Sequence, residues 1–509
     1  MPAILEGGLW SNMKLTLKKI AEYCGGRLFG DGSIEITGFF TDSRKVDPNK
    51  MFIPLRGERV DSHRFIPEIA ERGCKATFSQ VTVDAPVSYI LVSDPVAALQ
   101  MVAEKYRESI RIPVVGITGS VGKTTTKEMI SIALESGFKV HKTAGNANSQ
   151  IGLPQTILGI EPDDGIAVVE MGMSMPGEMG RIAKVAKPTM AVITNIGVSH
   201  IEFHGTKEKI MEEKLHIVDY LPPEGILFVN GDDELLKEIN GNTGHKLITF
   251  GIGAECDCRA EDIKIEGGKT LFTYCRGERR LPAMVPALGD HNVRNALAAF
   301  AVSEETGLKI EDVIEAVKKY SAPEMRQQIK VMQRVTIIDD SYNASPDSMT
   351  GAIDILCNYP GRHIAVLGDM LELGEYSKKG HIDVGAYAGE KGVDVLIGIG
   401  RQSAFIVDGF ADPKRAKHFD SNEEALAYLH KILSPFDVVL VKGSRGMHTD
   451  LVVKSVEKRL EENPMLSPDD LTYLKKIVGY YRAVTKAKNV LIEALRGKDE
   501  HMPDLRTLK

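Results

Sequence analysis

The sequence has few cysteines, and they form no pattern that would hold a zinc ion. Six cysteines are scattered over 509 residues. The closest pair, Cys256 and Cys258, is spaced too tightly for a C-x-x-C clamp, and no second pair completes a site. We therefore expect reduced thiols with structural roles.

Long apolar runs are also lacking. No stretch approaches the ~20 residues needed to span a bilayer. The N-terminal stretch MPAILEGGLWSNMKLTLKK does not have the charged-then-apolar layout of a secretion signal. We expect a cytoplasmic protein without a transmembrane segment. Met13 begins a more plausible first segment, so residues 1–12 are expected to be an upstream extension or a disordered lead.

A strong excess of one charge is missing as well. The chain has 63 Lys and Arg against 70 Asp and Glu, a formal net charge of -7, which gives no support to nucleic-acid binding. Hydrophobic residues make up 43% and charged residues 26%, as in ordinary globular proteins. A chain of this length exceeds what one hydrophobic core supports, so two to four domains are expected.

The apolar runs that are present predict an α/β protein. Residues 14–95 mix short strands with one or two helices. Apolar strands then alternate with helices, in the runs IPVVGIT, IAVVEMG, MAVITNIG and GILFVNGDD. This alternation indicates a mainly parallel, doubly wound sheet. A second series of the same kind begins at RVTIIDDSY and continues to FDVVLVKGSRG. The predicted domains are 14–95, 96–322 and 323–462, followed by a helical extension over 463–509.

The extension is expected to be a basic amphipathic helix. Residues 467–470 read as a capping box, and apolar side chains follow at roughly helical spacing up to Gly497. Packing on the protein's own body is the favoured interpretation. A helix that docks on a partner or a membrane surface is the alternative.

The stretch GITGSVGKTT at 116–125 predicts a phosphate-binding loop, although its first glycine is one residue away from the usual G-x-x-x-x-G-K-[ST] spacing. It lies between a β-rich run and a helix. Small residues there let backbone N–H groups turn toward phosphate oxygens, aided by the helix N-terminus. Lys123 can bridge phosphates and Thr124 can bind Mg²⁺. A glycine-rich turn without a ligand is the competing interpretation.

Two further candidates follow apolar strands. Glu170 ends the strand IAVVE, and a buried carboxylate there needs a partner, for which Mg²⁺ is suited. His200 follows the strand MAVITNIG. A histidine after a strand is commonly a structural hydrogen-bonder, but the neighbourhood of Thr124 and Glu170 makes it a site candidate.

Together these motifs resemble the Mur ligases of peptidoglycan synthesis, over about residues 14–460. The family writes its phosphate loop G-x-T-G-S-x-G-K-T, which accounts for the unusual spacing. TNIGVSHIEFHG at 194–205, GDHNVRNALAA at 289–299, VKGSRGM at 441–447 and FTDSRKV at 40–46 are further similar segments. IDDSYNASPDSM at 338–349 and AVLGDMLELGEYS at 365–377 favour the last ligase of the series over the lysine-adding one, which carries a D-Y-A-H-T-P-D type segment.

The resemblance implies three domains: a small N-terminal α/β domain for the uridine nucleotide, a central P-loop domain and a Rossmann-like C-terminal domain. It implies ATP and two Mg²⁺ ions, with Lys123, His200 and Lys214 as catalytic residues. Thr124, Glu170, His200 and Lys214 would bind metal, and Lys214 would be carbamylated by CO₂, because an ammonium group cannot bind a cation. Alone, a lysine in this charged helix would be taken for surface decoration. The implied ATP-binding residues are Gly116, Thr118, Gly119, Ser120, Gly122, Lys123, Thr124, Thr125, Asn292, Asn295, Arg326, Asp340, Tyr342 and Asn343.

Substrate-binding residues are also implied by the resemblance. The uridine end would meet Asp42, Ser43 and Arg44, with His63 as a further candidate, and the muramoyl-peptide path would be lined by Asn146 and Asn148. The incoming dipeptide or substrate peptide would meet Lys442, Ser444 and Arg445. The alternative for the lysine and arginine is structural salt bridging. Some loop positions depart from the family pattern: Ser62, Ser149, His216, Met325 and Ser345.

The implied reaction joins D-alanyl-D-alanine to UDP-N-acetylmuramoyl-tripeptide through an acyl phosphate, with small molecules as partners and a monomeric enzyme. Its domains would close around hinges near 96 and 322. One alternative is another ligase of this architecture, such as a lysine- or diaminopimelate-adding or a folylpolyglutamate-type enzyme. A non-catalytic ATP-binding scaffold is the alternative from another class.

Overall fold

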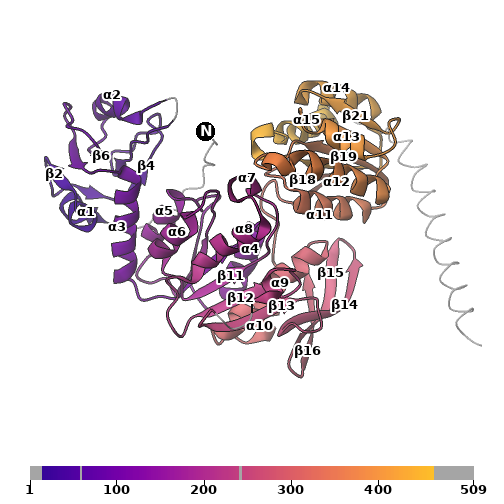
Figure 1. The fold of residues 1–509 in the computed structure, drawn as a ribbon, viewed down its shortest axis with the longest axis horizontal. Coiled ribbons are helices and arrows are strands. Elements are labelled where there is room, and N and C mark those ends of the chain that lie inside the picture. Colours follow the sequence, from indigo (N-terminus) through magenta and orange to yellow (C-terminus); the bar gives the residue numbers. More distant parts are fainter. Residues whose placement is uncertain (1–13, 58–59, 240–242, 463–509) are drawn as a thin grey trace, which may run out of the picture.

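The computed structural model describes residues 14–57, 60–239 and 243–462, and it arranges them around three larger sheets (Figure 1). The predicted lead at 1–12 and the basic helix at 463–509 lie outside the described residues. The mixed α/β class is confirmed. The strands of the three sheets fall within the three predicted domains, whose limits remain a prediction.

The first sheet has five strands in the order β2-β7-β6-β5-β4, parallel except for β2 against β7. A small antiparallel pair, β1 and β3, lies beside helix α1. The elements of this region are β1 (Leu15–Thr16), α1 (Leu17–Cys24), β2 (Arg27–Phe29), β3 (Glu35–Ile36), β4 (Gly38–Phe40), β5 (Lys50–Phe52), the 3₁₀ turn η1 (Ser62–Phe65), α2 (Ile66–Glu71), β6 (Ala76–Ser79) and β7 (Ser88–Leu91).

Helix α3 (Pro95–Ser109) links the first sheet to the second. It starts there because the Asp94 side chain accepts hydrogen bonds from the N–H groups of Val96 and Ala97, at 2.8 and 3.1 Å. Pro95 stands at the first helical position, where its missing N–H costs nothing.

The central sheet has nine strands in the order β16-β15-β14-β13-β12-β11-β8-β10-β9. Strand β8 lies between β10 and β11, so the carboxyl ends of these three strands meet at one edge. The strands are β8 (Val114–Thr118), β9 (Val140–Lys142), β10 (Ile166–Glu170), β11 (Met190–Ile193), β12 (Ile226–Asn230), β13 (Lys246–Gly251), β14 (Cys258–Glu266), β15 (Lys269–Arg276) and β16 (Arg279–Val285).

Helices cover both faces of this sheet, as expected for a doubly wound fold. Successive residues of β8 point to opposite faces. Val114 therefore joins the core shared with α3, α5 and α6, and Val115 joins the core shared with α4, α9 and α10. The helical elements are α4 (Lys123–Leu134), α5 (Gly152–Leu158), α6 (Glu178–Ala186), α7 (Ile201–His204), α8 (Lys207–Leu215), η2 (His216–Val218), η3 (Leu236–Glu238), α9 (Asp290–Glu305) and α10 (Ile310–Val317).

The last part of the central sheet was not visible in the sequence pattern. Strands β14, β15 and β16 pair antiparallel and extend the parallel sheet at one edge. Their outer face carries charged side chains, so they lack the continuous apolar runs of β8 or β10. Tyr274 of β15 packs edge-on against Phe300 of α9 and fixes the extension to the core.

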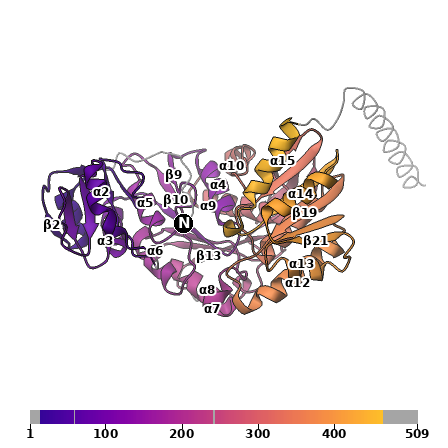
Figure 2. The ribbon, with the colours of Figure 1, turned by 90° about the horizontal axis from the view of Figure 1, so that it is seen from above.

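The C-terminal sheet has six strands in the order β17-β18-β22-β19-β20-β21, parallel except for β17. Figure 2 shows it and the first sheet on opposite sides of the central sheet. The elements are β17 (Gln328–Met332), β18 (Val335–Asp340), α11 (Pro346–Cys357), β19 (Arg362–Gly368), η4 (Gly374–Tyr376), α12 (Ser377–Glu390), β20 (Val395–Ile399), α13 (Ala404–Gly409), β21 (Ala416–Phe419), α14 (Asn422–Ile432), β22 (Asp437–Lys442), η5 (Arg445–Met447) and α15 (Asp450–Glu462).

The six cysteines are free thiols, five of them buried and Cys357 partly buried, as the sequence predicted. Burial raises the pKa of Cys256 and of Cys258 to about 11, which keeps both thiols protonated near neutral pH. Within the described ranges, every helix is too short or too polar to cross a membrane.

Candidate functional site

The predicted phosphate loop connects β8 to α4 and is held in shape by the strand beside it. Gly119 and Gly122 have φ angles of 149° and 86°, and a Cβ on Gly119 would lie 1.9 Å from Thr194 Oγ1, so only glycine fits there. The Asn195 side chain accepts a hydrogen bond from Val121 N at 2.8 Å. Asn195 lies in the segment 194–205 that resembles the family, but the sequence pattern assigns it no role.

Lys123 folds back over this loop. Its Nζ donates to the carbonyl oxygens of Gly119 and Ser120, at 2.7 and 3.4 Å. Burial lowers the pKa of Lys123, an effect that the nearby carboxylate of Glu170 opposes and Arg326 reinforces. The amine thus lies at the head of the loop among neutral acceptors, in a position where an anionic phosphate would be a stronger partner.

Glu170 ends β10 next to the phosphate loop and is 1% exposed. Its two carboxylate oxygens accept hydrogen bonds from Thr124 Oγ1 at 2.9 Å and from Asn148 Nδ2 at 2.7 Å. The backbone N–H of Glu170 donates to Thr143 Oγ1 at 2.9 Å. The structure therefore confirms that Thr124 and Glu170 meet, and it brings Asn148 to the same carboxylate.

His200 and Lys214 come from the segment after β11. His200 precedes α7, with a left-handed φ of 65°, and its Nδ1 lies 2.5 Å from Glu372 of the C-terminal region. Lys214 lies near the end of α8 and is 2% exposed. Burial, and secondarily the charge of Lys123, lowers the pKa of Lys214 well below its usual value, because burial penalises the charged form of the amine.

Helix α9 and the start of the C-terminal region form a polar wall beside the phosphate loop. Asn295 accepts a hydrogen bond from Thr126 at 2.9 Å and donates to Asn292 at 3.4 Å. Asn292 in turn donates to Gln327 Oε1 at 3.1 Å. Arg326 lies over the ring of Tyr342, 4.0 Å from its centre. Gln327 is a member of this wall that the sequence did not reveal.

Asp340 and Lys442, predicted for nucleotide and substrate respectively, pair with each other. Lys442 Nζ lies 2.6 Å from Asp340 Oδ2 and also donates to the carbonyl of Asn343 at 2.9 Å. Ser444 Oγ accepts from Leu371 N at 2.9 Å. The structural salt-bridge alternative thus describes Lys442 in this arrangement. The contact of Arg445 with Asp450, at 3.5 Å, is looser.

The N-terminal candidates lie on the first sheet. Arg44 pairs with Asp42 at 2.8 Å, and the Ser43 carbonyl accepts from Arg72 at 2.8 Å. His63 Nδ1 lies 2.6 Å from Asp61 Oδ1. The hydrogen bond from the His63 backbone N–H and, after it, this side-chain contact lower the pKa of Asp61 to about 2. Asn146 is exposed in the loop before α5. The substrate roles of these residues stay predictions.

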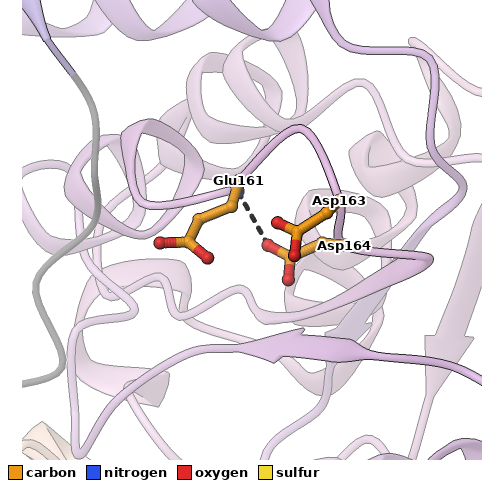
Figure 3. Close-up of side chains that lie close together, drawn as sticks. All are labelled: Glu161, Asp163 and Asp164. Atoms are coloured by element: carbon orange, nitrogen blue, oxygen red, sulfur yellow. Dashed lines mark hydrogen bonds between the residues drawn. The ribbon is translucent and has the colours of Figure 1, made fainter.

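One acidic cluster lies away from these residues, in the turn before β10. Glu161, Asp163 and Asp164 come together there, and the Asp164 carboxylate accepts from the Glu161 N–H at 2.7 Å (Figure 3). Lys139 lies within 2.8 to 3.2 Å of all three carboxylates. The lysine already neutralises part of the cluster, so it is best described as a surface ion network.

Comparisons with known proteins agree with this geometry. A family model described as the Mur ligase middle domain matches residues 117–303, and one described as the Mur ligase, glutamate ligase domain matches residues 325–445. The UDP-N-acetylmuramoyl-tripeptide--D-alanyl-D-alanine ligase of Bacillus subtilis is 38% identical over 455 residues, covering 87% of this chain and 98% of that protein.

Two solved structures are similar over most of their length. MurF from Acinetobacter baumannii has a TM-score of 0.81 and 29% identity, covering 87% of this chain and 99% of that one. The MurF ligase from Thermotoga maritima, solved in complex with ADP, has a TM-score of 0.75 and 30% identity, covering 84% and 98%. The phosphate loop, the buried carboxylate beside it and these relatives define an ATP-dependent ligase that forms amide bonds. The chain belongs to the Mur ligase family.

Proposed function

We propose that this protein joins D-alanyl-D-alanine to the tripeptide of UDP-N-acetylmuramoyl-tripeptide, with hydrolysis of ATP to ADP and phosphate, in the synthesis of peptidoglycan precursors. The observation that carries the proposal is the similarity to the Bacillus subtilis ligase along nearly its whole length. The meeting of the phosphate loop with Glu170 supplies the chemistry that such a ligase needs.

ATP is proposed to bind across the carboxyl edge of the central sheet. The loop from Gly116 to Thr125 would surround the phosphates, with Lys123 turning from its own carbonyls to the phosphate oxygens. Asn292 and Asn295 of α9, together with Arg326, Asp340, Tyr342 and Asn343, would surround the nucleoside. The hydrogen-bonded wall formed by Thr126, Asn295 and Asn292 supports this placement.

The donor set at Glu170 fits a magnesium ion. A buried carboxylate and a threonine hydroxyl 2.9 Å apart are hard oxygen ligands of the kind that Mg²⁺ takes together with phosphate oxygens. We assign Thr124 and Glu170 to one ion and His200 and Lys214 to a second. Bound Mg²⁺ would offset the charge on the transferring phosphoryl group.

Lys214 can serve as a ligand only if its amine changes chemically. Burial lowers the pKa of Lys214. The lone pair of the deprotonated amine can form a bond to the carbon of CO₂ with loss of one proton, leaving a carbamate anion. The carbamate offers oxygens to a cation where the ammonium would repel it. Lower activity in CO₂-depleted buffer, restored by bicarbonate, is the expected signature. Activity that ignores CO₂ would contradict the assignment.

The reaction then has two steps. A terminal carboxylate oxygen of the tripeptide attacks the γ-phosphorus of ATP, the bond to the β-phosphate oxygen breaks, and ADP leaves. The amine of D-alanyl-D-alanine attacks the acyl carbon of the resulting acyl phosphate, loses a proton and displaces phosphate. Lys123 offsets the negative charge that develops in the first step, and such electrostatic stabilisation is commonly the largest contribution.

The substrate ends are assigned from the first and third sheets. Asp42, Ser43, Arg44 and His63 would bind the uridine nucleotide, and Asn146 would line the path of the peptide. Ser444 and Arg445 would meet the incoming dipeptide, since an arginine at a glycine-rich strand end suits a carboxylate. Lys442 would join them only after leaving Asp340. We propose a monomer whose three domains close around small-molecule substrates.

Phosphate release with different amines tests the proposal. With UDP-N-acetylmuramoyl-tripeptide and ATP present, D-alanyl-D-alanine should stimulate release, whereas lysine, diaminopimelate and glutamate should not. Release with diaminopimelate on the dipeptide substrate, but not with D-alanyl-D-alanine, would point to an earlier ligase of the series. ATP binding without release under any of these conditions would favour the scaffold.

A further inference from the structure

The loop that carries His200 is held from the C-terminal region by two carboxylate-bearing residues. Val198 N donates to Asp347 Oδ2 at 3.3 Å, and Asp347 lies in the first turn of α11. His200 Nδ1 lies 2.5 Å from Glu372 Oε2. The Glu372 carbonyl also accepts from Glu202 N at 3.4 Å. Both views place α7 against the C-terminal region (Figures 1 and 2).

The same loop is joined to the phosphate loop on its other side. Ser120 Oγ accepts a hydrogen bond from Gly197 N at 2.8 Å. A Cβ on Gly197 would lie 2.2 Å from Asp347 Oδ2, so the glycine allows the carboxylate to approach. The loop is therefore a bridge with the phosphate loop at one end and the C-terminal region at the other.

The contact between His200 and Glu372 decides which ring nitrogen is free. An ionised carboxylate can only accept a hydrogen bond, so Nδ1 carries the proton and donates it to Glu372. In the neutral ring this leaves the lone pair on Nε2. Metal-binding histidines commonly use one ring nitrogen for the metal and donate with the other to a carboxylate. Both residues have left-handed φ angles, 65° for His200 and 61° for Glu372, a conformation held only where the surroundings demand it.

We propose that Glu372 is a positioning residue for His200, and that it completes the second metal site only when the C-terminal region lies against α7. This rests on the proposed function, because it takes His200 as a metal ligand. Docking of the C-terminal region would then be coupled to metal binding through one hydrogen bond. The site would bind its second ion poorly while the C-terminal region lies apart from α7. ATP would then not be hydrolysed before the C-terminal region, which is proposed to bind the dipeptide, has docked.

Stabilisation of the fold does not explain the contact. The Glu372 side chain is 48% exposed and that of His200 is 22% exposed, and ion pairs of this kind add little to stability. Replacing Glu372 should therefore leave thermal unfolding nearly unchanged. A large effect on the metal site with a small effect on the fold is what separates positioning from structural support.

The variants that test the proposal are Glu372→Ala and Glu372→Gln, with Glu375→Gln as the matched control. Glutamine keeps an oxygen that can accept from Nδ1, so it should preserve part of the effect, whereas alanine cannot. Glu375 lies three positions further on, is exposed, and makes no side-chain hydrogen bond among the described residues.

The first readout needs neither metal nor activity. Nitrogen NMR of the full-length protein without metal should show His200 with its proton on Nδ1, the signal being assigned by its loss in His200→Gln. Glu372→Ala should shift the ring toward the Nε2–H form, and Glu375→Gln should not. An unchanged His200 ring in Glu372→Ala would overturn the proposal, whatever the protein's activity.

The second readout is metal binding, measured by Mn²⁺ titration with paramagnetic resonance. One Mn²⁺ site should be lost in His200→Gln. In Glu372→Ala the Mn²⁺ affinity of that site should fall about tenfold, and in Glu372→Gln it should fall by less. In the ligase assay the same variant should need about tenfold more Mg²⁺ while the KM for the tripeptide stays unchanged. Equal Mn²⁺ binding in wild type and Glu372→Ala would overturn the proposal and leave the proposed function standing. If the wild type were inactive with D-alanyl-D-alanine while Glu372→Ala showed the expected shift of the His200 ring, only the proposed function would be overturned.

Discussion

Lysines lie near the carboxyl edges of both the C-terminal and the central sheet, but only in the C-terminal sheet does a carboxylate lie next to the amine. In the C-terminal sheet, Lys442 is 3% exposed and lies 2.6 Å from Asp340, so its charge is matched. In the central sheet, Lys214 is 2% exposed and Lys123 is partly buried. Neither amine has a carboxylate oxygen within 4.0 Å among the described residues, and burial lowers the pKa of each.

This difference separates a structural lysine from a functional one. A buried ion pair with good geometry is already satisfied and holds two strand ends together. A buried amine without a counter-charge is costly to the fold, and such perturbed groups gather where a ligand or a chemical step supplies the missing partner. The central edge is therefore where we place ATP and metal.

The largest effect is expected from Lys123→Ala. Loss of the charge that faces the phosphates should lower kcat by about a hundred- to a thousandfold. The fold should be retained, because within the described part of the chain the amine donates hydrogen bonds only to carbonyl oxygens of its own loop. Phosphate release measures the first expectation and circular dichroism the second. Lys105→Ala, at an exposed position of α3, is the control and should retain full activity.

Lys442→Met should act on the fold instead. It leaves the Asp340 carboxylate buried without a counter-charge, which costs about 3 kcal/mol. Urea unfolding followed by circular dichroism should show that the C-terminal region unfolds at a lower urea concentration than in the wild type. Adding Asp340→Asn removes the stranded charge and should recover part of the loss. A double variant no more stable than the single one would show that the pair does not act as described.

Lys214→Met tests the unmatched charge through pH. The folded state holds the pKa of Lys214 below its unfolded value, so the unfolded chain binds more protons between the two values. The free energy of unfolding of the wild type should therefore rise with pH in that window and fall as pH drops through the folded pKa. The slope for one proton is at most about 1.4 kcal/mol per pH unit. In Lys214→Met this contribution should vanish. The assignment fails if both proteins show the same slope in CO₂-free buffer.

The smallest effect is expected from Asn148→Ala, which removes one hydrogen bond to Glu170. The Mg²⁺ concentration for half-maximal activity should rise a few-fold, because the carboxylate is less well oriented. Asn146→Ala changes an exposed residue two positions earlier and should leave the Mg²⁺ requirement unchanged. A rise in the KM for the tripeptide alone in Asn148→Ala would instead support the peptide-path role first predicted for it.

The residues at the carboxyl edge of the central sheet could be predicted from the sequence, because the patterns that indicate them are local. The phosphate loop is one continuous segment, and Glu170 ends an apolar run whose strand lies next to β8. Contacts between distant segments could not be predicted. Lys442 and Asp340 are 102 residues apart, and they meet because β22 inserts between β18 and β19.

Two other features could not be predicted from the sequence, for physical reasons. The strands β14 to β16 alternate polar and apolar residues around charged side chains, which hides them from a search for apolar runs. Glu372 lies in the motif at 365–377, but only the placement of α7 against the C-terminal region brings it to His200.

The central claim is that ATP activates the tripeptide carboxylate at the edge where the unmatched lysines lie. It is tested most directly with UDP-N-acetylmuramoyl-tripeptide carrying ¹⁸O in its terminal carboxylate, in the presence of ATP and D-alanyl-D-alanine. Attack of that carboxylate on the γ-phosphorus transfers one labelled oxygen to each phosphate released. Mass spectrometry should therefore find one ¹⁸O in the phosphate for each amide bond formed. Unlabelled phosphate accompanying amide formation would contradict the account.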